Sequence, residues 1–179
     1  MHMSDPRARR TRVHVLHTVQ ALLRQPHPRP LTFTALAIEA EVSRRTLYLH
    51  WSSIEQVIAD ALQFNRVDYH PADADLPVAL RLREYLGNLR DGVHEPVARQ
   101  LGAALVAAAV TDPSAAAGLN DLTAFRLAEF RTHVGAITDF EYATLTGVIF
   151  ASEYILQRPV TDEQLDELAA RTLVTLRLE

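Results

Sequence analysis

The stretch Ser43-Arg44-Arg45-Thr46-Leu47-Tyr48-Leu49-His50-Trp51 follows a short helical pattern that begins at Thr32, and together they decide the predicted fold of this region. A helix-turn-helix has two short helices with small residues where they touch and polar side chains outside. Ala37 and Ala40 permit close approach, and Val42 lies at the turn. Leu47, four residues into the second helix, faces the core. Residues 32–51 therefore predict a helix-turn-helix.

The predicted outer face of the second helix is polar. Its members are Arg44, Arg45, Thr46, Tyr48 and His50. Residues near the start of such a helix reach base edges in the major groove, and arginine pairs bidentately with guanine. Arg44 and Arg45 are thus predicted to read bases, and the other three to contact phosphates. Thr32 and Ser43, which can cap the two helices, complete the predicted DNA-binding residues.

Two aromatic residues of this stretch have a second interpretation. Tyr48 is either a phosphate contact or part of the core. Trp51 follows the helix and precedes the next cap, so it is predicted to be core. Neither choice changes the predicted motif.

Residues 32–51 resemble the DNA-binding motif of the TetR family of transcriptional regulators. The matching elements are Leu36-Ala37, Ala40, Val42-Ser43, Thr46-Leu47-Tyr48 and His50-Trp51, within a resemblance that covers about residues 8–66. It implies a homodimer built on the last two helices, a ligand cavity in the C-terminal part, and repression that the ligand relieves. The chain departs from the family at Glu41, where a turn glycine is usual, and at Ile38, a position that is usually polar. A non-glycine residue at positive φ costs roughly 1 kcal/mol, so either the turn differs or the protein tolerates strain.

Charge is distributed unevenly along the chain. Residues 1–66 carry nine arginines against five acidic residues, a net charge of +4, whereas residues 67–179 have a net charge of −8. A basic first part suggests a polyanionic partner for it alone, although ordinary variation of surface charge gives the same pattern.

The fold class predicted for the whole chain is all-α, with about nine helices: a three-helix helix-turn-helix head and a C-terminal helical bundle. Residues 1–52 form the predicted DNA-binding domain and residues 53–179 the ligand-binding and dimerisation domain, joined by a fourth helix at about 53–69. Asp5 before Pro6 is the predicted start of the first helix. Five further helices are predicted at about 77–91, 95–110, 118–136, 139–157 and 161–177. Capping boxes are predicted for Ser53 with Gln56, Thr138 with Glu141, and Thr161 with Gln164.

The C-terminal part supplies candidates for two further sites. Aromatic, apolar and polar side chains that could line a cavity for an apolar or aromatic ligand are Phe64, Tyr85, Leu89, Leu105, Phe125, Phe130, Phe150, Glu153 and Tyr154. For any single ring, filling the core is an equally simple role. The predicted dimer interface consists of apolar stripes on the last two helices, namely Leu145, Val148, Ile149, Ser152, Ile155, Leu156, Leu165, Leu168, Ala169, Thr172 and Leu176.

Several classes of protein find no support in the sequence. The chain has no cysteine, which excludes disulfides and thiolate metal sites and fits a cytoplasmic protein. Motifs typical of a nucleophile elbow, a phosphate loop or a zinc helix are absent, so no enzyme, cofactor or metal is predicted. The longest apolar run is too short for a membrane span. The sequence predicts a DNA-binding regulator, and the resemblance implies that it is a repressor which a small molecule releases from palindromic duplex DNA. The alternatives are a DNA-binding regulator without such an effector, or a module that does not bind DNA.

Overall fold

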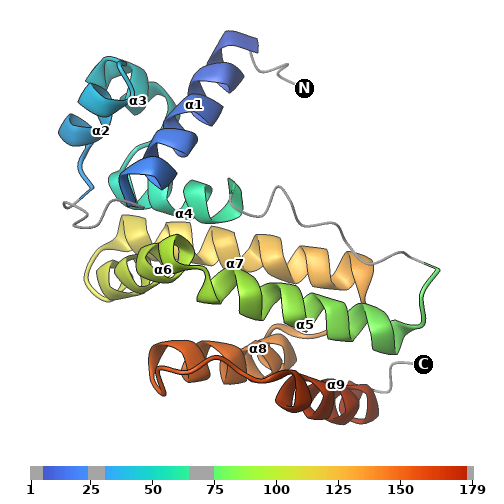
Figure 1. Ribbon diagram of the computed structural model, residues 1–179. Helices are drawn as coiled ribbons and strands as arrows, with labels where there is room; N and C mark the ends of the chain where they lie inside the picture. The colour runs from blue at the N-terminus through green and yellow to red at the C-terminus, as the bar shows by residue number, and fades with distance from the viewer. Residues whose placement is uncertain (1–5, 24–30, 65–74, 177–179) are drawn as a thin grey trace. The chain divides into compact units, whose positions relative to one another are not determined.

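The computed structural model describes residues 6–23, 31–64 and 75–176, and within these ranges the chain forms nine α-helices and no strand. The helices are α1 (Pro6–Leu23), α2 (Phe33–Glu39), α3 (Arg44–His50), α4 (Ile54–Phe64), α5 (Val78–His94), α6 (Pro96–Ala109), α7 (Pro113–His133), α8 (Asp139–Tyr154) and α9 (Asp162–Leu176) (Figure 1). The predicted all-α fold with about nine helices is thereby confirmed. None of the described helices is both long and apolar enough to cross a membrane.

Side-chain caps begin the last two helices, as their sequences predict. Thr138 accepts a hydrogen bond from the backbone N–H of Glu141 (3.2 Å), and the Glu141 carboxylate accepts one from the Thr138 N–H (2.8 Å). Thr161 and Gln164 exchange the same pair of bonds at 3.3 and 3.0 Å. Each box satisfies two backbone donors that the first turn of a helix leaves free. At α4, the Ser53 hydroxyl accepts a hydrogen bond from the Gln56 N–H, which is one half of the predicted capping box. The Gln56 side chain, however, accepts its hydrogen bond from the N–H of Ser52 and not from that of Ser53.

Helix α7 begins at Pro113, five residues before the predicted start near Gly118. The Asp112 carboxylate accepts a hydrogen bond from the Ser114 N–H (2.8 Å), and a proline fits the first helical position. A glycine inside a helix costs only about 0.5–1 kcal/mol, so Gly118 does not end it. The predicted cap Asp5 and the predicted end of α4 near residue 69 lie outside the described residues.

The chain divides into two compact units. Unit 1 comprises residues 1–65 and 100–122, and unit 2 comprises residues 66–99 and 123–179, so α6 and α7 run through both. In unit 1, α4 packs on α1, while α2 packs on both α1 and α3 (Figure 1). The predicted boundary after residue 52 therefore falls inside unit 1, because α4 packs on α1.

Unit 1 has a small core to which each of its first four helices contributes. Its completely buried side chains include Val15 and Val19 of α1, Leu36 of α2, Leu47 of α3 and Val57 of α4. Val15 and Val19 lie four residues apart, which is a spacing typical of the buried face of an amphipathic helix. Burial of Leu47 confirms its predicted position on the inner side of α3.

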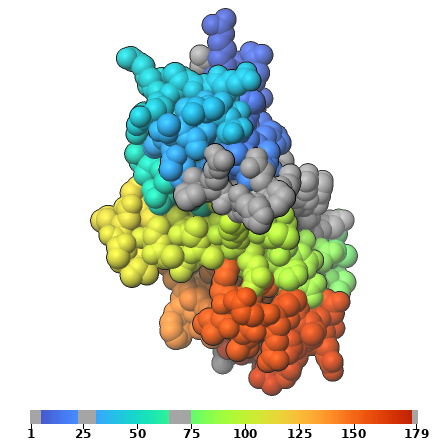
Figure 2. Space-filling model, turned by 60° about the vertical axis from the view of Figure 1, so that its left-hand side comes forward, coloured from blue at the N-terminus to red at the C-terminus, as the bar shows by residue number. Residues whose placement is uncertain are grey.

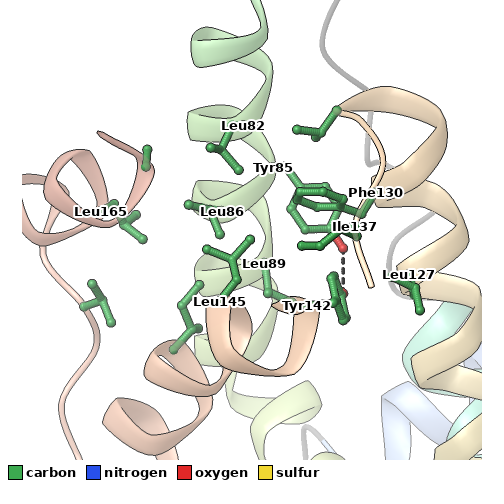
Figure 3. Close-up of a cluster of buried hydrophobic side chains, with 14 of the residues drawn as sticks. Leu82, Tyr85, Leu86, Leu89, Leu127, Phe130, Ile137, Tyr142, Leu145 and Leu165 are labelled. Atoms are coloured by element: carbon green, nitrogen blue, oxygen red, sulfur yellow. Dashed lines mark hydrogen bonds between the residues drawn. The ribbon is translucent and has the colours of Figure 1, made fainter. Parts of the chain in front are cut away.

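Unit 2 is organised around α5, which packs against both α8 and α9. Leu82, Leu86 and Leu89 line one flank of this helix, and Leu145 and Leu165 meet it from α8 and α9 (Figure 3). Three rings form the other flank. Tyr85, Phe130 and Tyr142 meet edge to face, with centroid distances of 5.0 and 5.8 Å.

Ion pairs hold the start of α9 to α5. Asp162 accepts hydrogen bonds from Arg90 (2.7 Å) and Arg83 (3.1 Å), and Arg83 also pairs with Asp166. The guanidinium groups of Arg90, first, and Arg83 hold the pKa of the Asp162 carboxyl below its ordinary value. Since the unfolded chain lacks these partners, the pKa of Asp162 differs between the folded and unfolded states.

We predict a pH-dependent stability difference between the wild type and Asp162→Asn. A carboxyl whose pKa is lowered by folding stabilises the protein above its unfolded pKa of about 3.9, and the contribution disappears as pH falls through the folded pKa. The wild type should therefore exceed the variant in free energy of unfolding above about pH 5, with the gap closing in acid. Urea unfolding at a series of pH values measures this gap.

Glu163→Gln is the matched control, because it removes a charge from the same first turn of α9. Glu163 makes no ion pair within the described ranges, so its variant should lack the acid-dependent gap. A gap for Asp162→Asn that stayed constant from pH 7 to pH 2 would contradict the prediction.

Candidate nucleic-acid interface

Two short capped helices, α2 and α3, form the candidate interface in unit 1. Thr32 accepts a hydrogen bond from the Ala35 N–H (3.1 Å) and begins α2. Ser43 accepts one from the Thr46 N–H (3.0 Å) and begins α3, and the Ser43 and Thr46 hydroxyl groups lie 2.8 Å apart. The predicted caps are thus confirmed. These three side chains fix the starts of the two helices.

The turn between α2 and α3 keeps the geometry that usually requires glycine. Glu41 has a φ of 51°, in the left-handed region. Its N–H donates to the carbonyl of Ile38 (3.2 Å), and the Val42 N–H donates to the carbonyl of Ala37 (3.0 Å). This pair of bonds is the Schellman ending of a helix, in which the residue after the C-cap is left-handed. Of the two possibilities that the sequence leaves open, the structure has the strained turn.

Helices α1 and α4 hold the ends of α2 and α3 from inside the unit. The His14 ring donates a hydrogen bond from Nε2 to the carbonyl of Ala40, at the end of α2 (3.0 Å). At the end of α3, the Trp51 indole donates from Nε1 to Oδ2 of Asp60 (2.6 Å), and Arg12 donates to the same oxygen (2.6 Å). Trp51 is buried, as predicted. We call this group of Arg12, Trp51 and Asp60 the Asp60 node.

The outer side of α3 is exposed and bears the predicted DNA-contacting side chains. Arg44, Arg45 and Tyr48 are exposed, whereas Thr46 and His50 are partly buried. Figure 2 shows one surface of unit 1, on which α2 and α3 lie outermost, in cyan and light blue. Tyr48 is 51% exposed, so the structure favours a surface position over the alternative of a core residue.

One flank of this outer side is a small stack. The Arg44 guanidinium lies 6.0 Å from the centre of the Tyr48 ring and donates a hydrogen bond to the Tyr48 hydroxyl (3.4 Å). The Tyr48 ring in turn packs against Phe33 of α2, with centroids 4.6 Å apart. Arg45 has no hydrogen bond or ion pair within the described part of the chain. The two arginines therefore differ in freedom: Arg44 is partly held and Arg45 is available to a partner.

The side chains predicted to line a ligand cavity are divided between the two units. Phe64 and Leu105 belong to unit 1, and the other seven belong to unit 2. Phe64 packs edge to face on His17, and Leu105 is fully buried. In unit 2, Tyr85, Leu89 and Phe130 are core residues, while Phe125 is exposed.

The hydroxyl groups of the buried rings are satisfied by protein atoms. The Tyr85 hydroxyl lies 2.7 Å from that of Tyr142, drawn as a dashed line in Figure 3, and donates to the carbonyl of Arg126 at 3.1 Å. The Tyr142 ring also packs edge to face on Phe130. The three rings therefore pack against one another in the core of unit 2.

The remaining candidates form a second group near the end of α8. Phe150 and Tyr154 stack with ring centroids 6.4 Å apart, and the Arg126 guanidinium lies over Phe150 at 5.9 Å. Glu153 is only 3% exposed; its carboxylate forms an ion pair with Arg99 (2.6 Å) and accepts a hydrogen bond from His94 (3.1 Å). Burial raises the pKa of the Tyr154 phenol. The Glu153 charge is thus compensated within unit 2.

The stripes predicted for a dimer interface divide between the inside and the outside of unit 2. Leu145, Ile149, Leu165, Ala169 and Thr172 face the interior of the unit. Ser152, Leu168 and Leu176 are partly buried, and Val148, Ile155 and Leu156 are exposed. Among the residues of the two stripes, only Val148, Ile155 and Leu156 are exposed apolar side chains. Phe140 and Val174, which the stripes do not include, are more exposed than most of their members.

Sequence reasoning missed two residues of the candidate interface. Asp60 interrupts the apolar run Val57–Leu62. This lone charge is the signal that could have identified Asp60 as the polar partner of a buried side chain. Leu49 is 75% exposed on α3. Its apolar side chain gave no sign of that position, since leucine is usually buried.

The comparisons with known proteins provide no family for this chain. No family model matches it, and no curated protein matches its sequence.

We predict that Glu41→Gly stabilises the protein. Glycine adopts the left-handed conformation freely, whereas other residues pay roughly 1–2 kcal/mol, partly offset by the greater freedom of glycine when unfolded. The expected gain in free energy of unfolding is about 0.5–1 kcal/mol. Urea unfolding followed by circular dichroism measures it.

Two controls separate the backbone effect from the loss of a carboxylate. Glu41→Ala removes the charge but keeps the Cβ, so it should not give the gain. Glu39→Gly places the same residue inside α2 and should lower the free energy of unfolding by about 0.5–1 kcal/mol. An equal gain from alanine and glycine at position 41 would show that charge, not φ, is responsible.

Proposed function

We propose that this chain is a sequence-specific DNA-binding transcriptional regulator that acts through the exposed side of α3. The observation that carries the proposal is the combination of two exposed arginines with a rigid setting. Arg44 and Arg45 lie on the outside of a helix whose start is capped by Ser43 and whose end is held by the Asp60 node. Base readout requires donors that are fixed relative to the duplex, and guanidinium groups suit guanine O6 and N7.

Electrostatics supports the same assignment. The net charge of +4 on residues 1–66 contrasts with −8 on the remainder of the chain, so attraction to a polyanion is concentrated in one part. Arginine contacts to phosphates release counterions and make affinity fall with salt. Thr32, Tyr48 and His50 are the side chains that we assign to phosphate contacts, with Ser43 and Thr46 fixing the helix start.

We further propose that the protein binds a palindromic operator as a homodimer. Exposed apolar side chains of α8, α9 and the segment after α8 supply the surface for it, with Val148, Ile155, Leu156 and Val174 as its members. A two-fold dimer must place its α3 helices about one duplex turn apart, roughly 34–36 Å. The interface thus has to fix the spacing of the two reading surfaces.

The role of unit 2 in regulation has two candidate forms. In the first, an apolar or aromatic small molecule binds in unit 2 and releases the protein from DNA, as the resemblance implies. In the second, no such effector exists, and unit 2 serves dimerisation or a protein partner. The mutual packing of Tyr85, Phe130 and Tyr142 favours the second, because these rings fill the space that a ligand would need.

We predict that Arg44→Ala combined with Arg45→Ala removes most of the sequence preference. Selection from random duplex DNA should yield a palindrome for the wild type, and binding to it is then measured by fluorescence anisotropy at several salt concentrations. Each base-paired arginine should contribute about 1–3 kcal/mol to operator binding. The double variant should bind the selected palindrome only slightly more tightly than a random duplex.

Arg171→Ala is the control, since Arg171 is an exposed arginine of unit 2 that pairs with Glu167. Its loss removes one positive charge from the protein without touching α3, and operator affinity should be unchanged. Equal affinity of the double variant and the wild type for the selected palindrome would refute the proposal. Failure of the wild type to enrich any duplex would do the same.

We predict that an effector, where one acts, both stabilises the protein and weakens its operator complex. A ligand at a concentration of 100 times its Kd stabilises the folded state by about 2.7 kcal/mol, which a thermal-unfolding screen of apolar and aromatic compounds detects. Because a ligand shifts an equilibrium only through its differential affinity for two states, the same compound must also lower operator affinity. A compound that binds tightly and leaves operator affinity unchanged contradicts the first form.

A further inference from the structure

The seven residues of α3 do not face outward equally. On an ideal helix with about 100° per residue, Arg45 and Leu49 each lie about 160° from Leu47. Tyr48 and Thr46 lie at about 100°, and the remaining two positions at about 60°. Leu47 is completely buried, so it defines the inner direction. The side chains that project furthest from unit 1 are therefore those of Arg45 and Leu49, one turn apart, and we call them the reading pair.

The freedom of the two arginines points the same way. The Arg44 guanidinium is drawn sideways onto Tyr48, which itself rests on Phe33. Arg45 has no such partner in the described residues, and its donors are free for an incoming acceptor. Of the two arginines proposed to read bases, Arg45 therefore holds the central position, whereas Arg44 forms with Tyr48 a flank that is better suited to a phosphate contact.

Leu49 presents an isobutyl group to solvent beside that free guanidinium. It is 75% exposed, the most exposed side chain of the apolar residues in α3. In the major groove of duplex DNA, the apolar group that a base edge offers is the C5 methyl of thymine. A leucine that enters this groove beside an arginine is therefore complementary to a thymine near a guanine.

We propose that Arg45 and Leu49 together read a guanine and a neighbouring thymine, with Leu49 covering the thymine methyl group. The inference rests on the proposed function and adds the base identities to it. Four residues of helix span about 6 Å, and successive bases on a strand are about 3.4 Å apart along the duplex axis. The two bases accordingly lie one or two steps apart in each half-site.

The test removes the methyl group from the DNA and the isobutyl group from the protein. In the palindrome selected by the wild-type chain, each invariant thymine is replaced by deoxyuridine, which keeps every hydrogen-bonding group and lacks only the methyl. Burial of one methylene-sized group contributes about 0.8 kcal/mol, so the wild type should lose about fourfold in affinity per contacted methyl. Leu49→Ala should bind the thymine duplex more weakly and show no further loss with deoxyuridine.

Ile38→Ala is the matched control on α2. Ile38 is likewise an exposed apolar residue, at 70%, but it lies outside α3. This variant should keep the full sensitivity to deoxyuridine. Because both Leu49 and Ile38 are at the surface, their replacement should leave the thermal unfolding temperature close to that of the wild type, which verifies folding.

The arginines supply a second readout. Arg45→Ala should lose preference at one guanine of each half-site, whereas Arg44→Ala should weaken binding to all sequences alike and lower the salt slope by about 1. A selected palindrome whose Leu49→Ala complex is as sensitive to deoxyuridine as the wild-type complex would overturn the reading pair. Undiminished operator affinity of Leu49→Ala, with loss of self-association instead, would also overturn it. Absence of any selected duplex would refute the proposed function itself, so the two failures are distinguishable.

Discussion

The orientation of α3 depends on one carboxylate oxygen, Oδ2 of Asp60. It accepts hydrogen bonds from the Trp51 indole and from Arg12, both at 2.6 Å, and so joins the end of α3 to α1 and α4. A charged acceptor makes both bonds stronger than their neutral counterparts. Loss of the carboxylate would leave the buried indole N–H without its partner, at a cost of about 1–3 kcal/mol. Burial of Trp51 thus requires an acceptor for its indole N–H, and Asp60 supplies it.

The other end of the motif is held against strain. The left-handed conformation of Glu41 costs roughly 1–2 kcal/mol, and it persists because neighbouring bonds require it. The two Schellman hydrogen bonds close the end of α2, and His14 binds the carbonyl of Ala40 next to the strained residue. The direction in which the chain enters α3 is therefore fixed by the same helix, α1, that supplies Arg12 to the Asp60 node.

Features that depend on residues close in sequence could be predicted, whereas contacts between residues far apart in the sequence could not. The caps at Thr32, Ser43, Thr138 and Thr161 depend on residues three positions apart, so the sequence contains all the information that they need. The inner position of Leu47 follows from helical periodicity in the same way. The lone charge of Asp60 within an apolar run marks that residue as unusual, but no local pattern identifies Arg12, 48 residues away, as its partner.

The apolar stripes of the last two helices show a different limit. Leu145 and Ile149 are buried against α5 while Val148 is exposed, although all three are apolar and close in sequence. Helical periodicity identifies an apolar face but not whether its own chain or a second copy covers it. Leu49 illustrates the reverse case: the predicted inner position of Leu47 already places residue 49 on the outer side of α3, but a leucine side chain taken alone suggests burial.

The shortness of α3 connects these observations. A helix of seven residues is well below the length that is stable alone in water, so its conformation and direction are supplied by packing. Leu47 anchors its middle, Ser43 its start and Trp51 its end. Because these three residues already hold α3 in place, the outward-facing side chains of Arg45 and Leu49 are not needed to position the helix. The exposed leucine and the unpaired arginine there make few contacts within unit 1, and the contact with duplex DNA that we propose would give both of them a role.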